Sequence, residues 1–191
     1  PGIREPKVTD HAITAAEDRF DALYVMDIEE RNNAGTTIVD ASDKPHVLNT
    51  VNHFAARRLD TSFAAAYFPD VIMEKPSNGT LLKVPPSVVV LGAISRNDSL
   101  ADPWFAPAGL SRGRLQAATD ASVVMNRDLL DEVYDADINP IYIPAGREGE
   151  VYIFGQKTLL QDQSALDRIN VRRLLINLRR RVKRVAERLL F

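Results

Sequence analysis

The stretch RINVRRLLINLRRRVKRVAERLLF, residues 168–191, concentrates positive charge at the end of the chain and determines its last structural element. It holds eight Arg and one Lys against a single acid, Glu187, which gives a net charge of +8. Because the 191-residue chain carries a formal net charge of −2, residues 1–167 sum to −10. A chain divided into an acidic body and a basic terminal segment is suited to binding another charged surface.

The apolar residues of this segment recur at helical spacing, with steps of 4, 3, 4, 3 and 4 residues. They are Val171, Leu175, Leu178, Val182, Val185 and Leu189. Asp167 or Asn170 is suited to cap the start of a helix, and Arg184 and Arg188 lie favourably near its negative end. We expect a long amphipathic helix that packs its apolar stripe on a sheet and presents its arginines to a partner.

Both ends of the chain favour a piece of a larger protein. The last three residues, 189–191, are apolar, and no glycine or asparagine stop signal follows the helix. The chain opens with Pro1-Gly2 and no methionine. Residues 1–15 lack clear periodicity, so we expect them to form a lead-in segment. Residues 16–191 are expected to form one α/β core domain.

Composition limits the class of protein. A hydrophobic content of 45% in 191 residues is enough for a sizeable core. The absence of cysteine excludes disulfides and thiolate metal sites. No stretch approaches the roughly 18 apolar residues that a membrane-spanning helix needs, and the N-terminus lacks the order of a signal peptide. We expect a soluble protein made in the cytoplasm, without membrane insertion.

Strand and helix patterns alternate along the body. The expected elements are strands at 20–28, 61–68, 141–143 and 151–154, helices at 46–59, 87–94 and 127–135, and a hairpin turn at Asn78-Gly79 between 71–75 and 80–84. Residues 97–114 are expected to be an ordered loop pinned by Trp104 and Phe105. The last two strands are too close for a helical crossover, which favours a mixed sheet. The sequence therefore predicts a layered α/β sandwich with a mixed sheet and a long amphipathic C-terminal helix.

The common catalytic and cofactor motifs are incomplete. The three histidines, His11, His46 and His53, have no metal-ligand spacing. Residues 155–158, GQKT, lack the glycines that a phosphate-binding loop requires around them. Residues 109–113, GLSRG, match the Gly-x-Ser-x-Gly pattern of hydrolases, but a proline-rich loop precedes them where a hydrolase needs a strand. A chance match in a turn is the preferred interpretation.

Acidic residues also gather between 128 and 137, on one short predicted helix and just after it. An acid/base pair would need carboxylates on facing walls of a site, so a solvated helical face is the preferred interpretation. The sequence thus predicts no catalytic residue, no cofactor and no metal site. An α/β enzyme of unrecognised type stays open only because the absence of a motif is not proof.

Short motifs follow one another in a fixed order over residues 64–191. They are Ala65-Ala66-Tyr67-Phe68-Pro69, Val84-Pro85-Pro86-Ser87 with Gly92 and Arg96-Asn97-Asp98, Trp104-Phe105-Ala106-Pro107-Ala108-Gly109, Ile138-Asn139-Pro140-Ile141, Gly155-Gln156-Lys157-Thr158 and Ile169-Asn170-Val171-Arg172-Arg173-Leu174. Each motif is weak alone, but their joint order resembles the tail sheath proteins of contractile-tailed bacteriophages, which have relatives in phage-tail-like bacteriocins. Residues 1–60 carry no motif that matches.

The resemblance implies a structural subunit of a virion, not an enzyme. Such subunits form stacked hexameric rings in a helical assembly around the tail tube, then contract and drive the tube through the host envelope for genome ejection. The implied partners are copies of the subunit, the tail tube protein, and baseplate and tail terminator proteins. The implied location is the virion tail, after synthesis in the host cytoplasm. The resemblance also implies an arm beyond the basic helix, donated to a neighbour's sheet and absent from this sequence.

Our first hypothesis gives the basic helix an interface role, toward the tube or a neighbouring subunit. Guanidinium groups are always charged and pair bidentately with carboxylates. A single exposed ion pair contributes only about 0–1 kcal/mol, so repetition over many subunits would have to hold the contact. The candidate interface residues are Arg172, Arg173, Arg179, Arg180, Arg181, Lys183, Arg184 and Arg188. The alternative is a core helix with solvated charges, which is preferred near Ile169 and Val171.

A second hypothesis, a nucleic-acid-binding module, would use the same arginines on a phosphate backbone. The acidic remainder of the chain argues against it. So does the lack of aromatic residues between the arginines, since single-strand binding relies on base stacking. No nucleic-acid partner is therefore expected.

Overall fold

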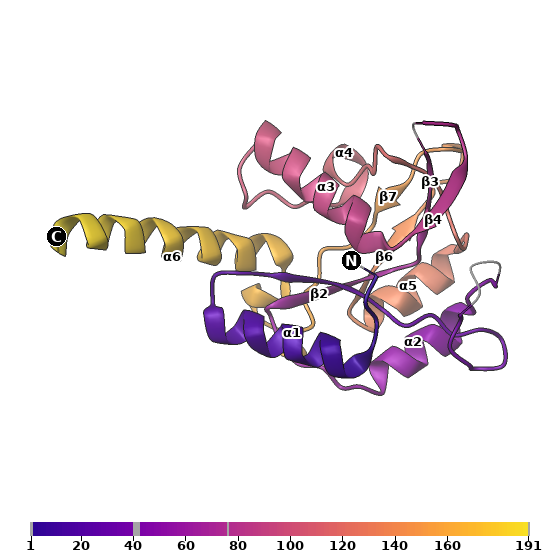
Figure 1. Cartoon of the computed structure of the whole chain (residues 1–191), viewed down its shortest axis with the longest axis horizontal. Coiled ribbons are helices and arrows are strands. Elements are labelled where there is room, and N and C mark those ends of the chain that lie inside the picture. The colour runs from indigo at the N-terminus through magenta and orange to yellow at the C-terminus, as the bar shows by residue number, and fades with distance from the viewer. Residues whose placement is uncertain (1, 40–42, 76, 191) are drawn as a thin grey trace.

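Two sheets and the helices around them form the body, and one long helix projects from it (Figure 1). The computed structural model describes residues 2–39, 43–75 and 77–190. Pro1 and Phe191, two of the residues behind the prediction of a piece of a larger protein, lie outside these ranges. The elements are α1 (Pro6–Arg19), β1 (Tyr24–Asp27), α2 (Val47–Ala55), β2 (Ala64–Phe68), β3 (Val71–Glu74), β4 (Leu81–Val84), α3 (Pro86–Leu100), α4 (Gly109–Arg112), β5 (Ala118–Ala121), α5 (Arg127–Asp135), β6 (Ile138–Tyr142), β7 (Tyr152–Ile153), a 3₁₀ turn (Ala165–Asp167) and α6 (Ile169–Leu190).

The main sheet has the strand order β1-β2-β6-β7. Strands β1, β2 and β6 run parallel, and β7 pairs antiparallel with β6. All five residues of the central strand β2 are buried, as is typical of a parallel strand covered on both faces. The predicted α/β class and the mixed sheet are confirmed.

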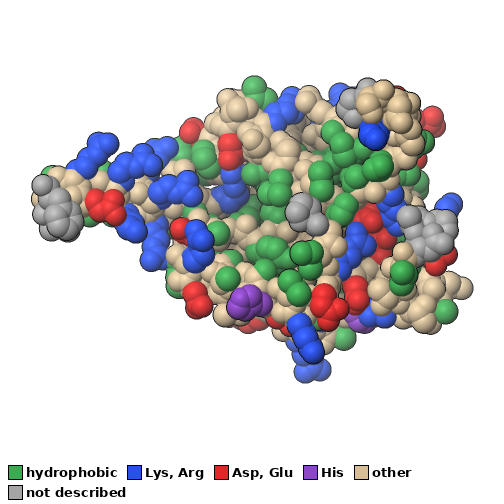
Figure 2. All heavy atoms as spheres, in the orientation of Figure 1, with side chains coloured by type: hydrophobic (Ala, Val, Ile, Leu, Met, Phe, Trp, Pro, Cys, Tyr) green, Lys and Arg blue, Asp and Glu red, His purple; other side chains and the backbone are tan. Residues whose placement is uncertain are grey.

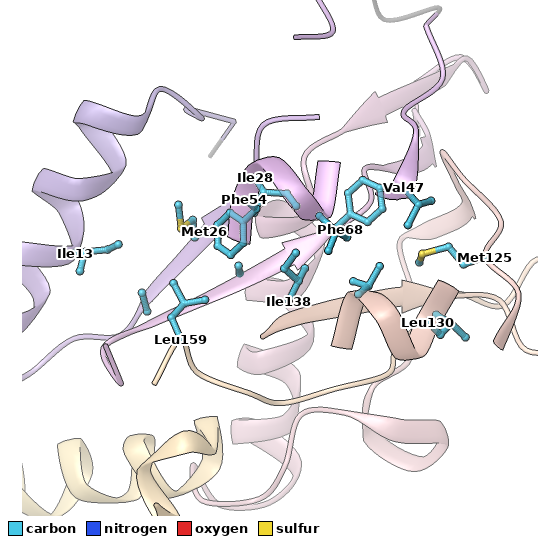
Figure 3. Packing of buried hydrophobic residues seen from close by; sticks show 14 residues of the cluster. Ile13, Met26, Ile28, Val47, Phe54, Phe68, Met125, Leu130, Ile138 and Leu159 are labelled. Atoms are coloured by element: carbon cyan, nitrogen blue, oxygen red, sulfur yellow. The ribbon is translucent and has the colours of Figure 1, made fainter. Parts of the chain in front are cut away.

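The two faces of β2 serve two separate cores. Ala64, Ala66 and Phe68 belong to a cluster with α1, α2 and α5. Figure 3 shows part of this cluster, with Phe54, Phe68 and Ile138 gathered beside the sheet. The intervening residues of β2 belong to the other cluster, with α3 and the first residue of α6. Alternation along one strand therefore builds the sandwich of helix, sheet and helix.

A second, antiparallel sheet has the order β4-β3-β5. The β3–β4 hairpin confirms the turn predicted at Asn78-Gly79, where Gly79 takes a positive φ of 68°. Strand β5 was not expected. Its sequence, Ala-Thr-Asp-Ala, has only one β-branched residue and two exposed polar ones, and its pairing with β3 makes it a strand.

Two segments contain helix that was not expected. Residues 1–15 were expected to be an unpatterned lead-in, yet α1 begins at Pro6 and runs to Arg19, with Thr9, Ile13 and Ala16 buried. Only these three positions of α1 are buried, so the apolar signal in the sequence is weak. The division into 1–15 and 16–191 stays a prediction.

The expected loop at 97–114 is also partly helical, because α3 continues to Leu100 and α4 adds a short turn at Gly109–Arg112. Helix α5 has the predicted bounds of 127–135, whereas α2 ends at Ala55, before the expected end at residue 59. Helix α2 begins after His46, whose ring Nδ1 accepts a hydrogen bond from the backbone N–H of Asn49 at 3.2 Å.

Candidate interface on the C-terminal helix

The root of α6, residues 169–177, is anchored in the body. Ile169 is fully buried in the core beside α3. Arg172 is only 8% exposed, donates a hydrogen bond to Ser62 Oγ and places its guanidinium 4.0 Å from the centroid of the Phe63 ring. Burial lowers the pKa of the Arg172 guanidinium. Arg172 therefore binds within its own chain, beside the start of β2.

Arg173 is held in a similar way. Its guanidinium forms an ion pair with Asp98 at the end of α3 and donates to the carbonyl oxygen of Pro103 at 3.0 Å. The Asn170 side-chain amide donates to the carbonyl oxygen of Trp104 at 3.3 Å. The Pro103–Trp104 loop is thus pinned by its backbone carbonyls to α6. The sequence predicted that the Trp104 and Phe105 rings hold this loop against the body. The contacts of its backbone carbonyls with α6 were not predicted, because every residue has a carbonyl and the sequence does not distinguish those that accept from a side chain.

Beyond the root, α6 leaves the body (Figure 1). The apolar side chains of its projecting half are exposed, from Leu178 through Val182, at 66%, to Leu189, at 81%. The expectation that this stripe packs on the sheet was wrong. At about 100° per residue, Ile169 and Ile176 share the face that meets the body, and the stripe lies roughly opposite.

Six of the eight candidate interface cations lie exposed on the projecting half, where Figure 2 shows Lys and Arg side chains gathered. They are Arg179, Arg180, Arg181, Lys183, Arg184 and Arg188. Arg179 lies 5.0 Å from the Phe20 ring centroid, and Lys183 has a weak contact with Glu187 at 4.0 Å. The remaining two candidates, Arg172 and Arg173, are those engaged inside the chain. Arg181 lies 6.0 Å from the Trp104 ring centroid. The outer half of α6 therefore presents a basic, partly apolar surface, and the first turn of that half still contacts the body.

The histidine and serine positions considered above do not converge on a reactive site. His53 Nε2 accepts from Arg31 at 2.6 Å and lies 3.7 Å from Glu29, and burial lowers its pKa. Ser111 is exposed on the short helix α4, with no strand before it. Within residues 2–39, 43–75 and 77–190, no cluster of three His, Cys, Asp or Glu residues is placed to hold a metal ion. Over the same described ranges, no helix combines the length and apolarity needed to cross a bilayer.

The GQKT motif is structural in this fold. The backbone N–H of Lys157 donates to Asn139 Oδ1 at 2.6 Å, and the Asn139 amide donates to the carbonyl oxygens of Ala66 and Lys157. Gly155 lies so close to Tyr134 that a Cβ would come within 2.5 Å of its ring. These contacts tie the segment after β7 to β2 and β6, so its polar groups serve the sheet.

Comparison with known proteins points to one class of assembly. No family model matches the sequence. The chain is similar to the tail sheath protein of Vibrio phage KVP40, with 37% identity over 108 residues, covering 56% of the chain and 16% of that protein. It is also similar to the tail sheath protein of Enterobacteria phage T4, with 26% identity over 193 residues, 96% of the chain and 28% of that protein. The chain spans less than a third of the length of either relative.

Solved structures share the fold. The anti-feeding prophage baseplate matches with a TM-score of 0.68 and 22% identity over 94% of the chain and 41% of the matched chain. The sheath complex of an extracellular contractile injection system, PVC, in its contracted state matches with a TM-score of 0.66 and 24% identity over 87% of the chain and 41% of the matched chain. The resemblance to contractile tail sheath proteins is confirmed, and these named relatives are structural proteins, not enzymes.

Proposed function

We propose that this chain is part of a structural subunit of a contractile tail sheath, which polymerises around a tail tube and contracts to drive the tube through a host cell envelope for genome ejection. The observation that carries the proposal is the similarity to a T4 tail sheath protein over 96% of the chain. The exposed apolar side chains of the projecting half of α6 support it, because contiguous exposed apolar residues are typical of surfaces that bind another molecule. The relevant activity is assembly, and the proposal assigns no reaction centre.

The projecting helix is suited to a contact that must both hold and release. Contiguous exposed apolar side chains are typical of surfaces that bind another molecule. The cations beside them contribute little individually and are screened by salt. Repetition around a cylinder makes many such contacts strong together, and rearrangement of neighbouring subunits releases them together.

The proposed partners follow from the same argument. Copies of the subunit would stack as hexameric rings in a helical sheath, with the tail tube inside and baseplate and tail terminator proteins at the ends. The proposed location is the virion tail, with synthesis in the host cytoplasm. Among the candidate interface residues, we assign the partner contact to the six exposed cations of the projecting half, of which Arg179 and Arg181 also lie over aromatic rings of their own chain. Arg172 and Arg173 would position the helix.

Immunogold electron microscopy tests the proposal. Antibodies raised against this chain would be applied to contractile tails purified from the virus that encodes it, in extended and contracted forms. Gold particles are expected along the whole sheath. Labelling confined to the capsid, or to soluble protein alone, would overturn the proposal. Labelling of tails that lack a sheath serves as the negative control.

Charge reversal tests the role of the helix. Arg179, Arg180, Arg181 and Arg184 would be replaced with Glu in the intact sheath protein, and its assembly on tubes followed by electron microscopy. Loss of assembly is expected, because the reversed charges repel an acidic partner surface. Normal sheath formation would remove the interface role of these residues.

Nucleic-acid binding is the competing function for the same arginines. It predicts tight binding of DNA at low salt that weakens steeply as salt rises. A gel-shift experiment distinguishes the two. The −10 net charge of residues 1–167 opposes approach to a phosphate backbone, so weak binding is expected.

A further inference from the structure

A cluster of buried charges lies at the carboxyl ends of β1 and β2, away from the candidate interface. Glu30 follows β1 and is 2% exposed, and Asp70 follows β2 and is 7% exposed. Lys83 of β4 and Arg4, from the segment before α1, supply the opposite charges. Four separate parts of the chain therefore meet in one ionic network, and the loss of one charge from such a network leaves another without its partner.

The two carboxylates depend on Arg4 to different extents. Glu30 accepts a hydrogen bond from the backbone N–H of Asp70 at 3.2 Å and another from Lys83 Nζ at 3.0 Å. It lies 3.7 Å from the Arg4 guanidinium. The Asp70 carboxylate accepts a hydrogen bond from Arg4 and lies 3.7 Å from Lys83 Nζ. Asp70 is therefore the main attachment of Arg4 to the body.

Residues 2–5, which we call the strap, are held to the body mainly by polar contacts at two points. Besides the Arg4 contacts, the backbone N–H of Gly2 donates to Asp27 Oδ2 at 2.7 Å. Ile3 is 57% exposed, so its side chain adds little apolar burial. In the part of the chain that the structure describes, residues 2–4 form no backbone–backbone hydrogen bond, and the buried Nε of Arg4 has no acceptor. The closed strap is therefore only weakly held once Arg4 loses its main partner.

The body keeps its own contacts when the strap leaves. Asp27 still accepts from the backbone N–H of Ser87 at 2.7 Å and from the Ser87 hydroxyl at 2.6 Å, which satisfies the first turn of α3. The backbone N–H of Ser122 still donates to the carbonyl oxygen of Asp70 at 2.8 Å. Helix α1 has its own buried residues. Opening of the strap is thus a local event that leaves both sheets in place.

Protonation of Asp70 acts on this balance. Within residues 2–39, 43–75 and 77–190, the charged side chains that face Asp70 are those of Arg4, Glu30 and Lys83. Burial and then Glu30 raise the pKa of Asp70 to about 6, and Arg4 opposes the rise. When the strap opens, Asp70 stays beside Glu30 but loses Arg4. The open state therefore binds the proton more tightly than the closed state, and acid favours opening.

We propose that residues 2–5 form an acid-released strap, which Arg4 closes across Asp70 and Glu30 at neutral pH and which opens in acid while the body stays folded. Opening uncovers the buried carboxyl groups at the ends of β1 and β2. The inference goes beyond the proposed sheath function, because it concerns a single chain by itself.

A single spin label tests the proposal. The sequence has no cysteine, so Ile3→Cys, at an exposed position, provides one thiol for a nitroxide on the strap. Val8→Cys, at an exposed position of α1, provides the control label. Electron paramagnetic resonance spectra of the 191-residue chain would be recorded from about pH 7.5 to about pH 4.5, a range that brackets the pKa of Asp70. Circular dichroism on the same samples would follow the fold of the body.

The Ile3→Cys label is expected to be restricted at neutral pH and to gain a mobile component in acid. The ratio of open to closed strap should rise about tenfold, the effect of a difference of one pKa unit between the two states. Arg4→Gln should make the label mobile throughout. Asp70→Asn, which imitates the protonated carboxyl, should give at every pH the spectrum that the parent gives in acid. Lys7→Gln, which removes an exposed cation nearby, should behave as the parent does, and the Val8→Cys label should not change.

Several results would overturn the proposal. A strap label that is mobile at neutral pH would mean that Arg4 does not hold the segment. A label that stays restricted in acid, or becomes more restricted, would mean that Asp70 does not release it. A label that stays restricted in Arg4→Gln would assign the attachment to Gly2 and Asp27 alone. None of these results bears on the sheath function, which immunogold labelling tests separately.

Discussion

The two halves of α6 have the same kinds of residue and opposite surroundings. In the root, Ile169 is buried in a core and Arg172 lies against Phe63, whereas in the projecting half Val182 and Arg184 are exposed. The apolar stripe runs through both halves on the face opposite Ile169, and its members Leu175 and Val182 are 42% and 66% exposed. Periodicity therefore identifies a helical face, but tertiary placement alone decides whether anything covers it.

The comparison also separates two uses of arginine. A buried guanidinium with fixed partners organises the body, and its removal leaves buried acceptors without a donor. An exposed guanidinium contributes almost nothing to folding and remains available for binding. Substitutions in the root should therefore act on stability, and substitutions in the projecting half should act on association.

The largest effect is expected from Ile169→Ala in the root. Removing a fully buried aliphatic side chain should lower the free energy of unfolding by about 2–5 kcal/mol. Val182→Ala, the matched change in the projecting half, should alter it by less than about 0.5 kcal/mol. Urea unfolding followed by circular dichroism measures both. Equal effects would remove the distinction between the two halves.

The pH dependence of stability sharpens the contrast between buried and exposed charges. Asp70 lies beside Glu30, with Arg4 and Lys83 as counter-charges. Burial and then the neighbouring Glu30 raise the pKa of Asp70 to about 6. The folded state therefore binds a proton more tightly than the unfolded state, so the stability contributed by the protonated carboxyl is lost as pH rises through 6.

For that reason, the free energy of unfolding of the parent should fall between pH 4 and pH 7 by up to about 3 kcal/mol relative to Asp70→Asn. Urea unfolding of both proteins at several pH values gives this difference directly. His53, whose pKa is lowered by burial, contributes the opposite slope in both proteins and cancels in the comparison. Parallel pH profiles would contradict the assignment.

An intermediate effect is expected from Arg173→Ala. The substitution removes the ion pair with Asp98 and the hydrogen bond to Pro103, at a cost of about 1–3 kcal/mol. Arg184→Ala, an exposed control on the same helix, should cost less than about 0.5 kcal/mol. Thermal unfolding at matched salt measures the difference. A high-salt repeat should leave the Arg173 effect largely in place, since the group is mostly buried.

The smallest effect on folding is expected from Val182→Glu. The side chain is 66% exposed, so the free energy of unfolding should change by no more than about 0.5 kcal/mol. Association with a partner should nevertheless be lost, because the new carboxylate would be buried in an apolar contact. Unfolding and sedimentation measured on the same sample test both statements. A variant that unfolds more easily would indicate that the projecting half packs on its own body.

Local chemistry made several elements predictable from the sequence. Strand β2 is a continuous apolar run, and the Asn78-Gly79 turn has an unambiguous backbone requirement. Helix α1 and strand β5 could not be found, because few of their residues face the body and their pairing depends on distant segments. The candidate interface was predictable in its charge. The opposite orientation of the stripe was not, since the anchors of the root, Ser62 and the Pro103 carbonyl, lie far away in sequence.

The root of α6 also makes the helix a lever. Its 22 residues give a length of about 33 Å, and its fulcrum is the contact of Arg172 with Ser62 and Phe63, just before β2. From Arg172 to Leu190 the helix measures about 27 Å, so a tilt of about 10° at Arg172 would displace the tip by about 5 Å. Force applied at the tip would in turn be delivered to the central strand, which belongs to both cores.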